Sequence, residues 1–533
     1  MSTPEADKSA PKAVAAIDIG SNSVRMLVAQ VSPDGHIEVL ERTQRPVRLG
    51  HDTFVAGRLM QRTMNAAITI LRDYKKLITT YAVETVRAVA TSAVREASNG
   101  DAFVDRVAMA VDIDVEVLDP AEESRLTVSA VREAGLGDLG VNSGKGLIVD
   151  VGGGSTLLTA LQDGEIAASE SCALGSIRLL EHLATANEPV ERGVDILRRQ
   201  IANVVDVLKR SMPLEQAQSF IAVGEDARFA AQRAGEPVPT NELAYTMSRK
   251  AFDRLVADCV RQTPEKLSRK YALPFANAER LTPALLICQA FLRATSLDRL
   301  ISCGVSMRDG LLLDLARRVT GDEDPELAES VVRSARSIGE KYRYDARHGE
   351  HVAALSLRLF DELQKEHGLT PRHRLLLHVA GILHEAGKFV SNRAHHKHSY
   401  YLIANSEVFG LRRDELQVVA DVARYHRRAE PKATHFEYLT LPREDRVAVN
   451  KLAAILRVAD ALERGHAQQV RDFQVELRPG ELILYVSGVT DLTLERQAIA
   501  EKGDMFEDTY GLTVRLEESA AAAPETRRAS PIE

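Results

Sequence analysis

The sequence has few cysteines and no long apolar segment. Its four cysteines are scattered without a Cys-x-x-Cys pair, so we expect buried free thiols and neither a zinc knot nor a disulfide framework. The longest apolar stretches, residues 146–151 and 375–383, are too short to cross a bilayer, and residues 1–12 contain no signal-peptide core. We therefore expect a cytoplasmic protein without a membrane partner, with disordered ends at 1–13 and 518–533.

The chain also lacks an excess of positive charge. Its formal net charge of −8 at pH 7 argues against a nucleic acid as partner. A local basic channel can still attract a polyanion to an acidic protein. Two basic segments are candidates for such a channel, and the residues concerned are Arg393, His396, Lys397, His398, Arg427 and Arg428. The alternative is an ordinary solvated basic face.

At 533 residues the chain is too long for one hydrophobic core, and its pattern divides it into several parts. Strand-like and helical runs alternate in two successive stretches, 14–133 and 134–318, which predicts two α/β lobes. A polar stretch at 319–325 that contains Gly and Pro is expected to be a linker. It leads to a helical domain at 326–470 and a small α+β domain at 471–517.

Two loops of the N-terminal half share one design. In each, a strand-like run is followed by an aspartate, a turn rich in glycine and serine, and a second apolar run; the aspartates are Asp18 and Asp150. Glycine and serine in such a turn let backbone N–H groups and hydroxyls approach an anion, and the aspartate can orient a metal ion or a water. Two such hairpins facing each other across a cleft would hold a phosphate chain from both sides.

A strand-turn-strand at the start of each of two α/β lobes is the layout of the actin, Hsp70 and sugar-kinase (ribonuclease H-like) fold. Further motifs follow in order: ATSAVREA at 90–97, EESRL at 122–126, LGSIR at 174–178, VGEDAR at 223–228 and CGVSMRDGLL at 303–312. With the two hairpins, these motifs resemble the exopolyphosphatase/guanosine pentaphosphate phosphohydrolase (Ppx/GppA) family. The resemblance covers about residues 14–467, as in the longer members that carry an HD-like C-terminal domain.

The resemblance implies roles for individual residues. Hydrolysis of a terminal phosphoanhydride needs a base that positions and deprotonates water, together with positive charge or N–H dipoles at the transferring phosphoryl group. The family's Glu-Glu-x-Arg motif marks Glu123 as this base, and Asp18 and Asp150 would hold Mg²⁺ or its waters. Phosphate oxygens would be bound by Ser21, Asn22, Ser23, Gly153, Gly154, Ser155 and Arg95.

Each of these assignments has a structural alternative. Glu123 and its neighbour Glu122 could be an exposed acidic pair at a helix start. Arg95 could form a surface ion pair with Glu96 or another neighbour. Arg25 is a secondary candidate, because its place early in a strand lets it face either the cleft or solvent.

The sequence departs from the family pattern at three places. Leu157 stands where the family has a glutamate after the second hairpin, so one expected carboxylate near the metal is missing. Asp119 and Pro120 replace a Ser-Gly pair before Glu122, and proline removes an N–H group and fixes φ. Glu225 replaces a second glycine near the expected nucleotide site, where its charge would disfavour a nucleotide.

The helical part has the ligand order of an HD phosphohydrolase. These residues are His348, His384, Glu385 and Asp460, where the adjacent acid is Glu rather than the usual Asp. An added methylene moves this carboxylate by about a bond length, and metal sites tolerate only small errors. His398 and His426 could supply further ligands. We favour the alternative, an inherited helical scaffold whose histidines pack or line a basic groove.

The sequence thus favours an exopolyphosphatase that releases orthophosphate from the end of linear polyphosphate, with Mg²⁺ as cofactor. A guanosine pentaphosphate phosphohydrolase acting on guanosine nucleotides is the first alternative. A regulator that binds polyphosphate or nucleotide without turnover is the alternative of another class. A kinase of the actin-like fold is disfavoured, because Gly224 followed by Glu225 is a poor ATP site. The family resemblance further implies a homodimer.

Overall fold

The computed structural model describes residues 11–136, 144–183, 189–320, 325–406, 408–427, 429–432, 434–489 and 491–519. The chain forms two compact units, Met1–Asp324 and Pro325–Glu533. Within the described residues, no helix is long and apolar enough to span a membrane. All four cysteines are buried free thiols, as expected. The expected disordered ends lie mostly outside these residues, but the first strand begins at Lys12 and the last continues to Ser519.

The first sheet of the N-terminal unit has five strands in the order β3-β2-β1-β4-β5. They are β1 (Lys12–Ile19), β2 (Ser23–Val31), β3 (Ile37–Pro46), β4 (Thr85–Ala90) and β5 (Val115–Val117), with helices α1 (Leu49–Ala56), α2 (Gln61–Thr80), α3 (Ser92–Arg95) and α4 (Gly100–Val111). The central strand β1 is buried on both faces, since Ile17 and Ile19 belong to one hydrophobic core and Val14 and Ala16 to another.

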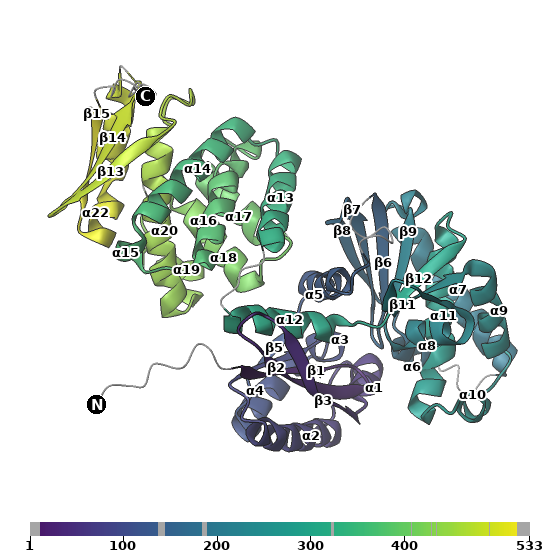
Figure 1. Cartoon of the computed structure of the whole chain (residues 1–533). Helices are drawn as coiled ribbons and strands as arrows, with labels where there is room; N and C mark the ends of the chain where they lie inside the picture. The colour runs from purple at the N-terminus through teal and green to yellow at the C-terminus, as the bar shows by residue number, and fades with distance from the viewer. Residues whose placement is uncertain are drawn as a thin grey trace, which may run out of the picture. The chain divides into compact units, whose positions relative to one another are not determined.

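The second sheet has seven strands in the order β10-β11-β12-β9-β6-β7-β8. Its strands are β6 (Lys145–Val151), β7 (Thr156–Gln162), β8 (Glu165–Cys172), β9 (Ser219–Val223), β10 (Glu236–Val238), β11 (Asn241–Ser248) and β12 (Arg299–Cys303). Its helices are α6 (Ser176–Leu183), α7 (Val190–Leu208), η3 (Leu214–Gln216), α8 (Glu225–Ala234), α9 (Arg249–Cys259), α10 (Pro264–Tyr271) and α11 (Phe275–Ala294). Each sheet contains one of the two predicted hairpins, β1–β2 in the first and β6–β7 in the second, and none of these four strands lies at a sheet edge (Figure 1).

Two helices link the lobes of this unit. Helix α5 (Pro120–Glu133) contributes Leu126 to the core of the first sheet and Val128 and Val131 to the core of the second. Helix α12 (Met307–Thr320) follows the last strand of the second sheet and returns to pack on β1. The lobes therefore exchange helices, and the chain boundary expected at 133/134 does not separate them in space. Helix α12 also includes Val319 and Thr320, which the sequence pattern assigns to a linker.

The C-terminal unit begins with a helical part. Its helices are α13 (Pro325–Lys341), α14 (Ala346–Glu362), α15 (Gln364–His367), α16 (Pro371–Leu383), η4 (Ala386–Phe389), α17 (His395–Ala404), α18 (Arg413–Arg424), α19 (Phe436–Thr440) and α20 (Arg443–Leu462). A three-stranded sheet with two helices follows, formed by β13 (Phe473–Arg478), β14 (Glu481–Ser487), α21 (Thr493–Lys502), α22 (Asp504–Tyr510) and β15 (Thr513–Ser519). One continuous hydrophobic core joins the two parts.

Candidate active site

The two hairpin loops of the N-terminal unit are closed by the same hydrogen bond. The N–H of Gly20 donates to the carbonyl of Ser23 at 3.0 Å, and the N–H of Gly152 donates to the carbonyl of Ser155 at 2.9 Å. The repeated sequence design is therefore also a repeated turn. The loops differ in what stands across the strand pair from each aspartate, since Asp18 pairs in register with Arg25 and Asp150 with Leu157.

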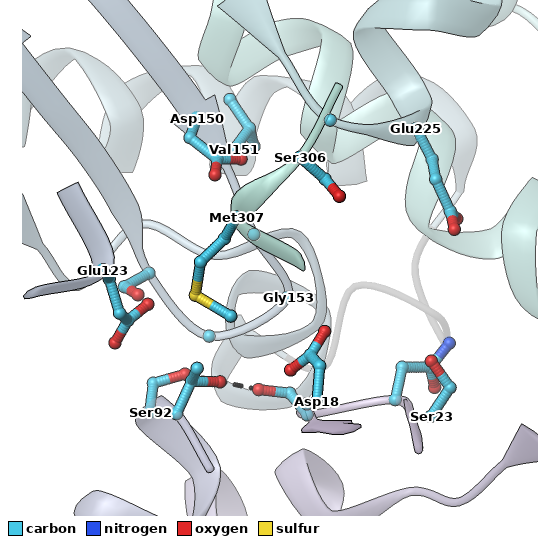
Figure 2. Close-up of a pocket in the computed structure, with 18 of the residues that line it drawn as sticks. Asp18, Ser23, Ser92, Glu123, Asp150, Val151, Gly153, Glu225, Ser306 and Met307 are labelled. Carbon is cyan, nitrogen blue, oxygen red and sulfur yellow. Dashed lines mark hydrogen bonds between the residues drawn. The ribbon is translucent and has the colours of Figure 1, made fainter. Parts of the chain in front are cut away.

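The two loops face each other across one cavity. It is lined by residues of both hairpins, including Asp18, Ser21, Asn22, Ser23, Asp150, Gly153, Gly154 and Ser155, and also by Glu123. Gly154 lies so close to Ser92 and Ser21 that a side chain could not be added there without displacing them. Figure 2 shows the carboxylates of Asp18, Glu123 and Asp150 around this cavity, with Glu225 on the side of the view opposite Glu123.

The adjacent residues Glu122 and Glu123 point into different surroundings. Both lie in the first turn of α5, where Asp119 caps the helix by accepting a hydrogen bond from the N–H of Glu122 at 2.8 Å. Successive helical residues project about 100° apart, so adjacent side chains point in different directions. Glu123 lines the cavity, whereas Glu122 forms ion pairs with Arg87 and Arg125 at 3.0 and 2.7 Å. The structure thus places Glu123, not its competitor, at the cleft.

Burial controls the protonation of the cleft carboxylates. It raises the pKa of Glu123 to about 7, and the nearby carboxylates of Asp150 and Asp18 add to the effect while Arg95 opposes it. It also raises the pKa of Asp150 to about 6, with Arg25 opposing. A carboxylate with a pKa near neutrality can take a proton from water and release it again, which is the property that a general base requires.

Arginines supply the positive charge of the cavity. Arg25, Arg228, Arg280 and Arg308 all line it. Glu225 is held between two of them, 2.9 Å from Arg25 Nη2 and in direct contact with Arg280. Arg308 lies 3.7 Å from Asp18, and its buried Nε atom has no hydrogen-bond partner within the described residues.

Two further arginines support the walls of the cavity. Arg95 pairs with Glu123 and is not among the residues that line the cavity, so its predicted contact with phosphate stays a prediction. Its alternative partner Glu96 pairs with Arg178 instead, at 2.6 Å. Arg178 also donates to the carbonyl of Gly154 at 2.5 Å and so braces the second loop.

The donor atoms around the cavity suit a hard divalent cation. Asp18 and Asp150 both line the cavity, and serine hydroxyls of both hairpin loops line it as well. Oxygen donors of this kind bind Mg²⁺, which keeps several waters when it meets a phosphate. The upward shift of the Asp150 pKa reflects burial and the nearby Asp18 charge, and both are the conditions that a bound cation relieves.

The sequence reading missed part of the positive charge. Arg228 and Arg308 lie within two of the motifs we quoted, yet nothing in their spacing showed which side chain of each motif would face the cavity. Arg280 lies on α11, outside all of them. Only the packing of α11 against the second lobe brings it to Glu225, so no local sequence signal could have identified it.

The C-terminal unit brings together the four residues with the HD ligand order. His348 lies on α14, His384 and Glu385 follow α16, and Asp460 lies on α20. The Nε2 atom of His348 is 3.5 Å from a carboxylate oxygen of Asp460 and 3.7 Å from one of Glu385. His384 is 3.7 Å from Asp460. These contacts bring the four residues into one cluster within the C-terminal unit, in which His348, His384 and Asp460 are buried.

The basic segments of the same unit lie at its surface. Arg393, Lys397 and Arg427 are exposed, whereas His396 and His398 are half-buried. Burial lowers the pKa of His396 to about 4, and the nearby Arg427 adds to this shift. The sixth residue of the predicted channel, Arg428, lies outside the described residues. The predicted contact of these residues with polyphosphate stays a prediction.

Comparisons with known proteins agree on one family. The profile described as the Ppx/GppA phosphatase family matches residues 27–319, and the profile described as Ppx/GppA phosphatase, domain III, matches residues 332–500. The exopolyphosphatase 2 of Mycobacterium tuberculosis is 30% identical over 321 residues, which are 57% of this chain and 98% of that protein. The guanosine-5'-triphosphate,3'-diphosphate pyrophosphatase of Vibrio campbellii is 25% identical over 426 residues, or 78% of this chain and 80% of that protein.

Solved structures show the same fold. The crystal structure of an exopolyphosphatase from Cytophaga hutchinsonii superposes with a TM-score of 0.52 at 23% identity, covering 58% of this chain and 99% of that one. This confirms the prediction of two actin-like α/β lobes for the N-terminal unit, in which each lobe contributes one hairpin to the cavity.

Proposed function

The chain belongs to the Ppx/GppA phosphatase family and is a phosphoanhydride hydrolase, and from this premise we propose that it releases orthophosphate from the end of linear inorganic polyphosphate. The observation that carries the choice of substrate is the chemistry of the cavity wall. Most of the described residues that line the cavity are small, charged or hydroxyl-bearing, and none is aromatic; the others are Asn22, Val151, Leu157 and Met307. A wall of this kind suits a chain of phosphates and offers no ring on which a guanine base could stack.

The terminal phosphoryl group would lie between the two hairpin loops. Ser21, Ser23 and Ser155 bring hydroxyls to this position, and Gly153 and Gly154 allow the backbone to approach closely. Arg280 and Arg308, with the other arginines of the wall, would bind the phosphates that follow, because a guanidinium group contacts phosphate oxygens in pairs.

Glu123 would position and deprotonate the attacking water. It is 7% exposed and opens onto the cavity, and its pKa of about 7 leaves a substantial ionised fraction near neutral pH. Arg95 is a positioning residue in this scheme, since it contacts Glu123 and favours the ionised form.

Asp18 and Asp150 are the residues that would hold a divalent cation such as Mg²⁺. When bound, the cation neutralises charge on the phosphate oxygens and orients them. The two aspartates have different cross-strand neighbours. Asp18 is paired with Arg25 in the first hairpin, whereas Asp150 is paired with Leu157 in the second.

The proposal is tested by a competition assay with Glu123→Gln as the probe of mechanism. Wild-type protein given equal concentrations of polyphosphate and guanosine pentaphosphate is expected to release orthophosphate mainly from polyphosphate. Loss of a general base is expected to slow the reaction by about 10²–10⁴-fold in Glu123→Gln. Glu133→Gln, on the exposed end of the same helix, is the matched control and should keep the wild-type rate. Preference for the nucleotide would overturn the substrate, and an unchanged rate in Glu123→Gln would exclude Glu123 as the base.

A guanosine pentaphosphate phosphohydrolase is the second candidate. It is favoured by the relative from Vibrio campbellii, whose likeness extends over more of this chain than that of the exopolyphosphatases. Glu225 argues against it, because this carboxylate lines the cavity where the family resemblance places a nucleotide, and its charge would repel the phosphates of the nucleotide. Replacing Glu225 with glycine should therefore raise the rate on guanosine pentaphosphate relative to polyphosphate.

A further inference from the structure

Six side chains of the C-terminal unit lie close together, and five of them are buried. They come from five helices or the turns that follow them and are His348, His384, Glu385, His395, His426 and Asp460. We call these residues the histidine–carboxylate cluster. The Nε2 atoms of His348 and His384 are buried and have no hydrogen-bond partner within the described residues. A buried polar atom without a partner costs about 1–3 kcal/mol, so two in one place require an explanation.

Backbone carbonyls fix the orientation of three of these imidazoles. Nδ1 of His384 contacts the carbonyl of Gly381 at 2.7 Å, and Nδ1 of His426 contacts that of Ala423 at 2.6 Å. Nδ1 of His395 contacts the carbonyl of Asn392 at 3.3 Å. A carbonyl can only accept, so each Nδ1 carries a proton, and in the neutral ring each Nε2 then presents a lone pair to the cluster.

The first group of ligand atoms has the spacing of a metal site. The ligating atoms of His348, His384 and Asp460 all lie within 4.8 Å of one another. Asp460 Oδ1 is 3.5 Å from His348 Nε2 and 3.7 Å from His384 Nε2. For bonds of about 2.1 Å, the ligands of a tetrahedral ion lie about 3.4 Å apart. These separations are too long for hydrogen bonds and close to those around an ion.

A second group of ligand atoms, from His395 and His426, brings two nitrogen lone pairs face to face. Nε2 of His395 and Nε2 of His426 lie 3.2 Å apart. Because both rings donate through Nδ1, no proton is available for a hydrogen bond between the two Nε2 atoms. Two imidazole nitrogens at this distance suit adjacent ligand positions of one ion, which would accept both lone pairs.

Glu385 reaches both groups with one carboxylate. Its Oε2 is 3.7 Å from His348 Nε2, and its Oε1 is 4.0 Å from His395 Nε2. We propose that the histidine–carboxylate cluster binds two divalent transition-metal ions, one at His348, His384 and Asp460 and one at His395 and His426, with Glu385 bridging them. The extra methylene that we expected to disable the site thus gives the carboxylate the reach to serve both ions.

Two lysines hold the carboxylates in the orientation that this site needs. Lys502 contacts Oδ2 of Asp460, which leaves Oδ1 directed at the histidines. Lys388 lies 2.5 Å from Oε2 of Glu385. Ligating carboxylates in metal sites are commonly oriented by such outer partners. Lys502 ends α21, so the C-terminal sheet segment contributes directly to this site.

The nature of the ligands selects the class of ion. Imidazole nitrogens outnumber carboxylates in the cluster, and imidazole favours first-row transition ions such as Mn²⁺, Fe²⁺, Co²⁺ or Zn²⁺ over Mg²⁺. The cleft of the N-terminal unit offers oxygen donors instead. The two sites should therefore be loaded by different metals, and the cluster does not depend on the function proposed for the cleft.

Counting bound cobalt tests the proposal. Full-length protein carrying Asp150→Asn, which removes a cleft carboxylate, is stripped with a chelator, equilibrated with Co²⁺, desalted and analysed for cobalt. We expect two ions per chain and a visible absorption spectrum typical of nitrogen ligation. Replacing both His395 and His426 with alanine in this background should remove one ion. His378→Ala, on α16 but beside Glu350 and away from the cluster, should keep both.

Each result of the cobalt count either supports or overturns the two-ion site. A count below two in the Asp150→Asn protein overturns the two-ion site whatever the variants do. A count that stays at two after both histidines are replaced places the second ion elsewhere and also overturns it. Circular dichroism establishes that the variants are folded, and if the double variant is not, His426→Asn alone is expected to lower the count to one.

Discussion

The contact between Arg95 and Glu123 makes the pH dependence of the reaction adjustable by one substitution. Glu123 has a pKa of about 7 in the wild-type cleft, with Arg95 acting to lower it. The base must be ionised to act, so activity should rise with pH through about 7 and fall about tenfold per unit below it. Arg95→Met keeps an unbranched apolar stem and removes the guanidinium group with its charge.

The size of the shift follows from the loss of an opposite charge in contact with a buried carboxylate. Such a charge changes a pKa by about 1–3 units, so the acid limb of Arg95→Met should move upward by that amount. With a shift of about 2 units, the ionised fraction of Glu123 at pH 7 falls from about one half to about one hundredth, a loss of about 50-fold in kcat. The rates of the two proteins should converge above about pH 10, where Glu123 is largely ionised in both.

The assay is the initial rate of orthophosphate release from polyphosphate, measured from acid to alkaline pH at saturating substrate. The divalent cation is kept constant, because a cation at Asp18 and Asp150 removes charges that raise the pKa of Glu123. A limb that stays near pH 7 while KM rises would refute the reasoning. It would show that Arg95 binds substrate phosphate, as the sequence alone suggested.

Other positions give further expectations. Asp150→Asn should weaken activation by Mg²⁺ by about tenfold or more, measured as the Mg²⁺ concentration for half-maximal rate, and an unchanged value would remove this residue from the cation site. Gly310→Ala should cost about 1–3 kcal/mol in urea unfolding, because the new methyl group would collide with the backbone of Leu126. Replacing His396 and Lys397 together with alanine should weaken binding of long polyphosphate chains while hydrolysis of short ones survives. Equal loss on both lengths would defeat the idea of a channel.

Local patterns were sufficient to predict the two α/β lobes and their hairpins. The apolar runs, the aspartates and the small residues of each turn are contiguous in the sequence, so strand, turn and strand could be identified together. The structure adds that the turns close with the same hydrogen bond at Gly20 and Gly152. It also shows α5 and α12 crossing between the lobes, which depends on packing between distant segments and has no local signal.

Only those residues of the candidate site that lie in contiguous sequence motifs could be predicted. Asp18, Asp150 and Glu123 were chosen from loops and one helix start, and all three line the cavity. The choice between Glu122 and Glu123 depended on the resemblance, because the helical rotation that separates them does not say which one faces the cleft. Arg280 needed the tertiary structure, since its helix carries no motif.

Different experiments would distinguish the adjacent glutamates Glu122 and Glu123 of α5. Glu122, Arg87, Arg125 and Asp314 form a buried group of alternating charges that ties α5 to β4 and α12. Breaking such a group leaves an uncompensated buried charge, which costs about 3–5 kcal/mol. A mutational scan that records only product formation would rank Glu122 beside Glu123 as essential. Unfolding measurements would distinguish them, because Glu122 belongs to the ion-pair group that stabilises the fold, whereas Glu123 is the residue we propose as the base.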